Sequence, residues 1–248
     1  MRFDKAGYRI AKERINGLIK DLHPDWKNTE GFIADGIICP DVYEKQPVRI
    51  LCILAESYGY DGSGMIDIED QGKDDILGLR NRTVQTPRRL ATLLYLLQRS
   101  SESGVKVTPE EWKEFPRLLA PSDEKSTAIL QDALSKVAWI NVKKASNGNG
   151  TKLDAAECGA HASRNKEILR QQIEAIAPNL IIVCGEDAFR ALCEMGLLGP
   201  NTVMARKWRM QGTGDGPRVI EVTHPGYRKW AGYYEIYGYF EVIYTQMT

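Results

Sequence analysis

Four short runs of mostly apolar residues restrict what this sequence can fold into. They lie at Val48–Leu54, Val137–Val142, Asn179–Gly185 and Arg218–Thr223. Each is bounded by turn residues and is short, which favours a buried β-strand over a buried helix. Longer segments with helical spacing separate the runs, and parallel strands need such crossover helices between them. The sequence therefore predicts an α/β protein, a three-layer α/β/α sandwich with a central four-stranded, mainly parallel sheet.

The segments between the strands carry apolar residues at the three- and four-residue spacing of amphipathic helices. Thr86 before Pro87 is a candidate helix start, and Thr108 opens a capping-box pattern with Glu111. The acidic, glycine-rich segment after Glu56 is predicted to be a functional or mobile loop. We expect helices at about residues 4–22, 86–99, 109–119, 121–134, 160–177, 186–195 and 230–244.

The chain has 248 residues, 43% of them hydrophobic, which is enough for one large core. We expect residues 1–47 to form an N-terminal helical extension packed on the core, and residues 48–248 to form the main domain. No apolar run reaches the roughly 18 residues that span a membrane. The first residues lack the apolar core of a signal peptide, so the sequence predicts a cytoplasmic protein with no membrane partner.

Charge and motif content exclude several classes of protein. Lys and Arg number 33, as do Asp and Glu, so any affinity for nucleic acid must come from local clusters. The five cysteines form no C-x-x-C pair and the three histidines are far apart, which argues against a metal site. The phosphate-binding loops of nucleotide and dinucleotide enzymes and the G-x-S-x-G elbow are absent. We therefore expect no metal and no cofactor.

The predicted strands end on distinctive residues, namely Glu56, Asn141, Gly185 and His224. Because the carboxyl ends of parallel strands meet at one edge, where ligands bind, these residues predict an active site. Basic residues follow three of the four strand ends, a pattern typical of phosphate-backbone binding as well as of an ordinary solvated surface. They are Arg80, Arg82, Arg88 and Arg89, then Lys143 and Lys144, and then Arg228 and Lys229.

Four motifs lie at these strand ends. They are Ala55-Glu56-Ser57-Tyr58-Gly59, Ile140-Asn141-Val142-Lys143-Lys144, the run IEAIAPNLIIVCGEDAF at 173–189, and His224-Pro225-Gly226-Tyr227-Arg228. In order and spacing, over about residues 48–245, they resemble those of the uracil-DNA glycosylase superfamily. The nearest branch has G-E-A-P-G at the first motif and four cysteines for an iron–sulfur cluster. This chain keeps only the glutamate and the last glycine of that motif and lacks those cysteines, so we expect no cluster.

The resemblance implies hydrolysis of an N-glycosidic bond in DNA. Glu56 would activate water and offset charge on the sugar, and His224 would donate a hydrogen bond to the departing base. Asn141, with Ser57 and Tyr58, would recognise a base flipped out of the helix. Tyr227 or Arg228 would wedge into the gap that the flipped-out base leaves in the DNA. The DNA would be held by a larger set of residues: Arg80, Arg82, Arg88, Arg89, Lys143, Lys144, Gly185, Tyr227, Arg228 and Lys229.

The identity of the base is open. The superfamily's stacking phenylalanine has no counterpart near residues 78–81, which argues against plain uracil. Similar side-branch proteins act in antiviral defence, so a modified pyrimidine of phage DNA, such as a hypermodified cytosine, is one expectation and uracil repair is another. A DNA-binding module without catalysis and a small-molecule or nucleoside hydrolase are alternatives from other classes. The oligomeric state is open, with a monomer as the default expectation.

Overall fold

The fold is described by a computed structural model of the chain. The residues it describes are 3–22, 32–56, 65–71, 85–113, 124–144, 155–198, 202–205, 208–211, 217–226 and 233–247.

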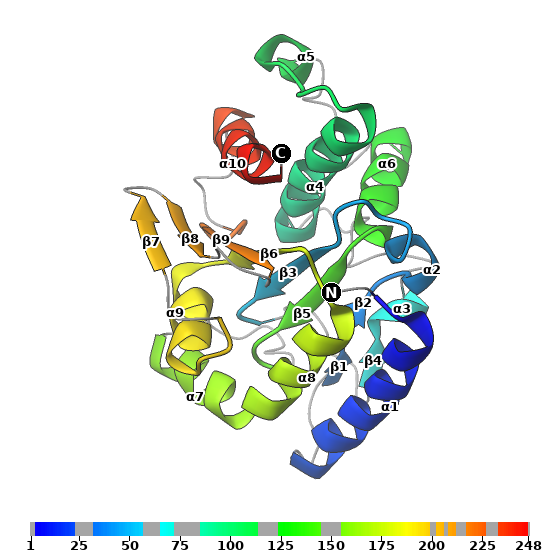
Figure 1. The fold of residues 1–248 in the computed structure, drawn as a ribbon, viewed down its shortest axis with the longest axis vertical. Helices are drawn as coiled ribbons and strands as arrows, with labels where there is room; N and C mark the ends of the chain where they lie inside the picture. The colour runs from blue at the N-terminus through cyan, green and yellow to red at the C-terminus, as the bar shows by residue number, and fades with distance from the viewer. Residues whose placement is uncertain are drawn as a thin grey trace.

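Helices and strands alternate along most of the chain (Figure 1). The strands are β1 (Phe32–Ala34), β2 (Gly36–Ile37), β3 (Ile50–Leu54), β4 (Met65–Asp67), β5 (Ala138–Asn141), β6 (Leu180–Cys184), β7 (Thr202–Ala205), β8 (Trp208–Gln211) and β9 (Arg218–Val222). The helices are α1 (Lys5–Leu22), α2 (Pro40–Tyr43), α3 (Ile68–Gln71), α4 (Gln85–Ser103), α5 (Pro109–Lys113), α6 (Glu124–Ser135), α7 (Ala155–Arg164), α8 (Lys166–Ile176), α9 (Glu186–Glu194) and α10 (Tyr233–Met247).

The four predicted strands are confirmed as β3, β5, β6 and β9, and they are mutually parallel in the order β5-β3-β6-β9. The predicted count of four strands was too low. β2 pairs antiparallel with β5, so that β2, β5, β3, β6 and β9 form a five-stranded, mixed and mostly parallel part of the sheet. Beyond β9, the antiparallel strands β8 and β7 continue the same sheet. A strand as short as β2 leaves no alternating pattern to detect, which is why the sequence did not predict it.

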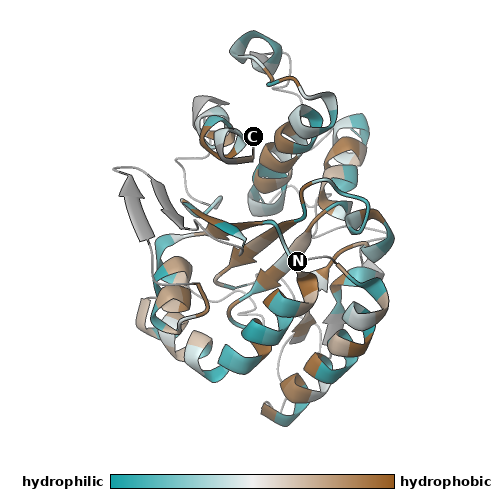
Figure 2. Cartoon of the chain, viewed as in Figure 1, coloured by the Kyte–Doolittle hydropathy of each residue, from teal (hydrophilic) through white to brown (hydrophobic). Residues whose placement is uncertain are grey.

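Helices cover both faces of the sheet because alternate residues of the buried strands point to opposite sides. Cys52, Leu54 and Cys184 belong to the core beneath α4, α6 and α10. Leu51, Ile53 and Val183 belong to a second core, beneath α7, α8 and α9. Figure 2 shows hydrophobic residues along the central strands, while the helices carry both hydrophobic and hydrophilic residues. Residues buried on both faces explain the unbroken apolar runs of the sequence.

The N-terminal segment contributes to the sheet as well as packing on the core. The α1 helix, predicted at residues 4–22, is confirmed and packs against α8 through Ile15, Ile19 and Ile168. Its Tyr8 accepts a hydrogen bond from the backbone N–H of Ile37, in β2 (2.7 Å). Residues before 48 thus supply one strand of the main sheet. A second, two-stranded parallel sheet joins β1 to β4.

Several local predictions can be compared directly with the structure. The capping box is confirmed, since the Glu111 N–H donates to Oγ1 of Thr108 (3.2 Å) and the Thr108 N–H donates to Oε2 of Glu111 (2.8 Å). The single helix predicted at residues 160–177 was wrong. Two helices, α7 and α8, meet at Asn165, whose side-chain Nδ2 donates to the Val142 carbonyl (2.9 Å). The acidic segment after Glu56 contains β4 and α3 in its described part, so it is not wholly a loop.

No helix within the described ranges has both the length and the apolar character needed to span a bilayer.

Candidate functional site at the carboxyl edge of the sheet

Strand register brings the predicted site residues to one edge of the sheet. Asn141, Leu54, Cys184 and Val222 form a row across β5, β3, β6 and β9. Glu56 lies two residues beyond this row, after the end of β3. Gly185 and His224 follow it by one and two residues on β6 and β9. The predicted convergence of the four strand ends is therefore confirmed.

The same edge contains the topological switch point of the sheet. The chain passes from β3 to β5 on one side of β3, whereas β6 and β9 lie on the other side. In open α/β sheets, ligands bind outside the carboxyl ends of the strands where the order reverses in this way. Here that point lies between the ends of β3 and β6, next to Glu56 and Gly185. Topology alone thus favours this edge as the candidate ligand site.

Glu56 is a buried carboxyl group directly after β3, with 3% of its surface exposed. Lys143 lies nearby, because its backbone N–H donates to the Ala55 carbonyl (2.9 Å). Burial lowers the pKa of the Lys143 ammonium, and attraction to the carboxylates of Glu56 and Glu157 opposes that shift. Buried carboxyl groups are rare unless paired or functional. Glu56 therefore has the enclosure that acid–base chemistry requires.

His224 lies beside the end of β6. A Cβ atom placed on Gly185 would come within 3.5 Å of the His224 Cβ, and Gly185 has a positive φ of 115°, a conformation that favours glycine. The Gly226 N–H donates a hydrogen bond to Nδ1 of His224 (3.0 Å). An imidazole that accepts at Nδ1 carries its proton on Nε2 when it is neutral. The turn after β9 thus presents His224 as a hydrogen-bond donor through Nε2.

Arg89 holds this turn in place. Its Nη1 donates to the Pro225 carbonyl (2.8 Å) and its Nη2 donates to Oε1 of Gln85, one turn earlier on α4. We expected Arg89 to bind phosphate. In the structure the described contacts of Arg89 connect α4 to the turn that carries His224.

Asn141 is 2% exposed and ends β5. Its backbone N–H and its Nδ2 both donate to Oδ2 of Asp35, at 2.6 Å and 3.3 Å. Its Oδ1 is buried and has no hydrogen-bond partner among the described residues. A buried acceptor left unpaired costs free energy, so it indicates a missing partner such as a ligand.

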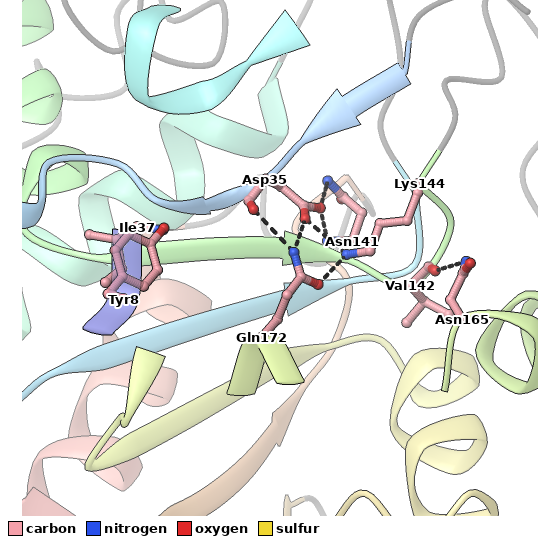
Figure 3. A network of polar contacts seen from close by, with 8 residues as sticks. All are labelled: Tyr8, Asp35, Ile37, Asn141, Val142, Lys144, Asn165 and Gln172. Carbon is pink, nitrogen blue, oxygen red and sulfur yellow. Dashed lines mark hydrogen bonds and ion pairs between the residues drawn. The ribbon is translucent and has the colours of Figure 1, made fainter. Parts of the chain in front are cut away.

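Two of the predicted DNA contacts are wrong, since the structure buries them. The side chain of Lys144 is 0% exposed, and its Nζ lies 2.8 Å from Oδ1 of Asp35 and 2.7 Å from Oε1 of Gln172 (Figure 3). Burial lowers the pKa of the Lys144 ammonium, against attraction and hydrogen bonding from Asp35. Arg88 is 5% exposed and its Nη2 donates to Oγ1 of Thr127 on α6 (3.0 Å). Neither side chain can reach a phosphate without leaving its internal partners.

The remaining predicted residues fall into two groups. Lys143 is half-buried and Gly185 directly precedes α9, so both keep a place at the edge. The others lie outside the described residues: Ser57, Tyr58, Arg80, Arg82, Tyr227, Arg228 and Lys229.

Sequence reasoning missed Asp35 and Gln172. Asp35 lies in the run FIADGIICPDVY, which we expected to be only a lead-in to the first strand. A carboxylate between apolar neighbours was the available signal, since a charged residue in a buried run needs a partner. Within the described ranges, no group of three His, Cys, Asp or Glu side chains is placed to hold a metal ion.

Comparison of the chain with known proteins gave no match, either to a protein-family model or to a curated protein sequence.

Proposed function

We propose that the protein is a DNA glycosylase that hydrolyses the N-glycosidic bond of a flipped-out pyrimidine and leaves an abasic site. The observation that carries the proposal is the shared edge of β5, β3 and β9, with a buried carboxyl group, an unpaired amide oxygen and an imidazole donor. The motif resemblance to uracil-DNA glycosylases and the α/β/α layering around the parallel strands β5-β3-β6-β9 support the same reading.

Each of these three groups has a distinct role in the proposed reaction. Asn141 accepts a hydrogen bond from the base through Oδ1 and so holds it in the site. The bond between C1′ and the base nitrogen then breaks with its electron pair remaining on the base. His224, a donor through Nε2, stabilises that negative charge, an effect worth roughly 3–4 kcal/mol for a well-placed donor. Donors fixed before the reaction need no reorganisation when the charge develops.

Glu56 acts on the sugar side of the bond. Its carboxylate offsets the positive charge that develops on the sugar and accepts a proton from the attacking water, whose oxygen bonds to C1′. Lys143, whose ammonium is attracted to the Glu56 carboxylate, is the proposed contact for a backbone phosphate at this edge. The proposed DNA contacts among the described residues are thus Lys143 and the start of α9 at Gly185. Lys144 and Arg88 have internal partners instead, and Arg89 supports the turn that carries His224.

The test is base release from single- and double-stranded oligonucleotides carrying uracil, 5-methylcytosine, hydroxymethylcytosine or glucosylated hydroxymethylcytosine. Alkali cleaves the strand at each abasic site formed. We expect cleavage at one class of base, and its loss in His224→Ala with DNA affinity retained. No abasic sites on any strand, together with tight and salt-sensitive DNA binding, would favour a binding module without catalysis. Release from free nucleosides but not from DNA would favour a small-molecule hydrolase.

A further inference from the structure

Asp35 is a buried charged group to which the proposed reaction gives no role. It lies between β1 and β2, and its carboxylate meets residues from β5, from α8 and from the turn after β5 (Figure 3). Oδ2 accepts from the Asn141 backbone N–H and from Asn141 Nδ2. Oδ1 accepts from Lys144 Nζ and from Gln172 Nε2, each at 2.8 Å. Gln172 Nε2 also donates to the Asp35 carbonyl (3.1 Å).

These four hydrogen-bond donors occupy the acceptor positions of the Asp35 carboxylate. An ionised carboxylate only accepts hydrogen bonds, and its two oxygens offer about four acceptor positions. All four neighbours are donors, one of them the Lys144 ammonium, so charge and hydrogen bonding are balanced without solvent. The side chains of Asp35 and Lys144 are both 0% exposed. A group so fully enclosed holds its neighbours in a fixed geometry.

The neighbour that matters for function is Asn141. A carboxamide can turn either its oxygen or its nitrogen toward a contact, and its orientation is set by the hydrogen bonds around it. Since the Asp35 carboxylate can only accept, the Nδ2 of Asn141 must face it, and Oδ1 must turn away. That Oδ1 is the buried acceptor without a partner among the described residues. Asn141 is the register partner of Leu54, two residues before Glu56, so the residue that carries the unpaired oxygen lies at the candidate edge.

We propose that Asp35 is a positioning residue. With Lys144 and Gln172 it fixes the Asn141 carboxamide so that the ligand always meets the acceptor Oδ1 and not the donor Nδ2. The site then selects bases that present an N–H donor at this point. Two chemistries provide one, a ring N–H as in uracil-type bases and an exocyclic amino group as in cytosine-type bases. The identification of the ligand as a DNA base rests on the proposed function, whereas the fixed acceptor does not.

The test compares two double variants. Asp35→Asn/Lys144→Met removes both charges but keeps an oxygen that can face Asn141. Asp35→Leu/Lys144→Met removes the charges and the oxygen, so the Asn141 amide is free to turn. Circular dichroism checks that each variant is folded. Both lack the ion pair, so the acceptor facing Asn141 is what distinguishes them.

The readout is base selectivity. Release of uracil is compared with 3-deazauracil, whose ring has C–H in place of N–H, and release of cytosine with 2-pyrimidinone, which lacks the amino group. Intrinsic leaving-group differences and partial unfolding cancel when these ratios are compared between variants. In the wild type and in Asp35→Asn/Lys144→Met we expect the base with the N–H to be preferred. In Asp35→Leu/Lys144→Met that preference should fall about tenfold, the value of one hydrogen bond to a buried group. Equal ratios in both double variants would overturn the proposal.

A second readout on the wild type depends neither on catalysis nor on the folding of a variant. The Asn141 carboxamide signal is followed by ¹⁵N nuclear magnetic resonance while the deoxynucleoside of each of the four bases is added, because a free base carries an additional N–H at the position of the glycosidic bond. We expect it to move with uracil or cytosine and not with the matching base that lacks the N–H. Such a response without any base release from DNA would refute the glycosylase and keep the positioning role. No response to any of the four bases would overturn the base selectivity assigned to Asn141, whatever the activity on DNA.

Discussion

Replacing Lys144 by methionine should destabilise the protein far more than the same replacement at Lys106. Lys144 Nζ lies 2.8 Å from Oδ1 of Asp35, with both side chains 0% exposed. Lys106 Nζ lies 2.7 Å from Oε1 of Glu241, with side chains 41% and 47% exposed. The two ion pairs have nearly equal length, so they differ chiefly in burial.

The expected loss in the free energy of unfolding follows from this difference in burial. Removing one partner of a buried ion pair leaves an uncompensated charge in the interior and costs about 3–5 kcal/mol. Removing one partner of an exposed pair changes the free energy of unfolding by at most about 1 kcal/mol. Asp35→Asn/Lys144→Met neutralises both buried partners, so it should be more stable than Lys144→Met alone.

Urea unfolding at pH 7, followed by far-ultraviolet circular dichroism, measures these free energies. The proteins needed are the wild type, Lys106→Met, Lys144→Met and the double variant, with transition slopes checked for agreement. The reasoning would be refuted by a Lys144→Met variant within about 1 kcal/mol of the wild type, the range of an exposed pair. It would also be refuted by a double variant less stable than Lys144→Met.

Two further predictions concern the site and the core. Gly226→Ala would place a Cβ 3.0 Å from Nδ1 and 3.1 Å from Cε1 of His224, so base release should fall about 10- to 100-fold. Gly159→Ala, whose Cβ would meet nothing within 4 Å, should leave release unchanged, and equal rates in the two variants would contradict the role of the turn. Burial raises the pKa of the Cys52 and Cys184 thiols above the ordinary 9.0, so only the unfolded chain loses these protons and stability falls as pH rises above 9. Each thiol contributes a slope of about 1.4 kcal/mol per pH unit to the free energy of unfolding, so stability should decline less steeply with pH in Cys52→Ala/Cys184→Ala. Urea unfolding from about pH 8.5 to 10.5 measures this slope, and a slope equal to that of the wild type would refute the prediction.

The sequence predicts the strands and the site edge for one physical reason. Strands buried on both faces must be apolar throughout, so their ends are visible in the sequence. The register then places Asn141 beside Leu54, and Glu56, Gly185 and His224 at most two residues beyond the same row. Predicting the candidate site edge needed no information about side-chain contacts.

What the sequence could not predict depends on contacts between distant segments. Lys143 and Lys144 are identical neighbours in the sequence, yet only Lys144 is fully buried. Its partner Asp35 is 109 positions away, and no local pattern connects them. The break between α7 and α8 is similar, because the side chain of Asn165 at the junction is bonded to the carbonyl of Val142 across the fold. In each case a hydrogen bond between segments far apart in the sequence accompanies a feature, a buried lysine or a helix break, that local propensity does not reveal.

The most direct test of the account is the rate of base release by Glu56→Gln under single-turnover conditions, with Glu157→Gln as its control. Both carboxylates act on Lys143, so both variants remove one acidic neighbour of that lysine. Glu56 alone is buried at the end of β3, whereas Glu157 is exposed on α7. The measurement uses whichever base the wild type releases, at DNA concentrations above the dissociation constant of each variant.

We predict that Glu56→Gln lowers the rate at least about 100-fold, the usual contribution of an acid–base group, with DNA affinity retained. Glu157→Gln should keep the wild-type rate. A Glu56→Gln enzyme that releases the base as fast as Glu157→Gln would contradict the assignment of this edge as the catalytic site.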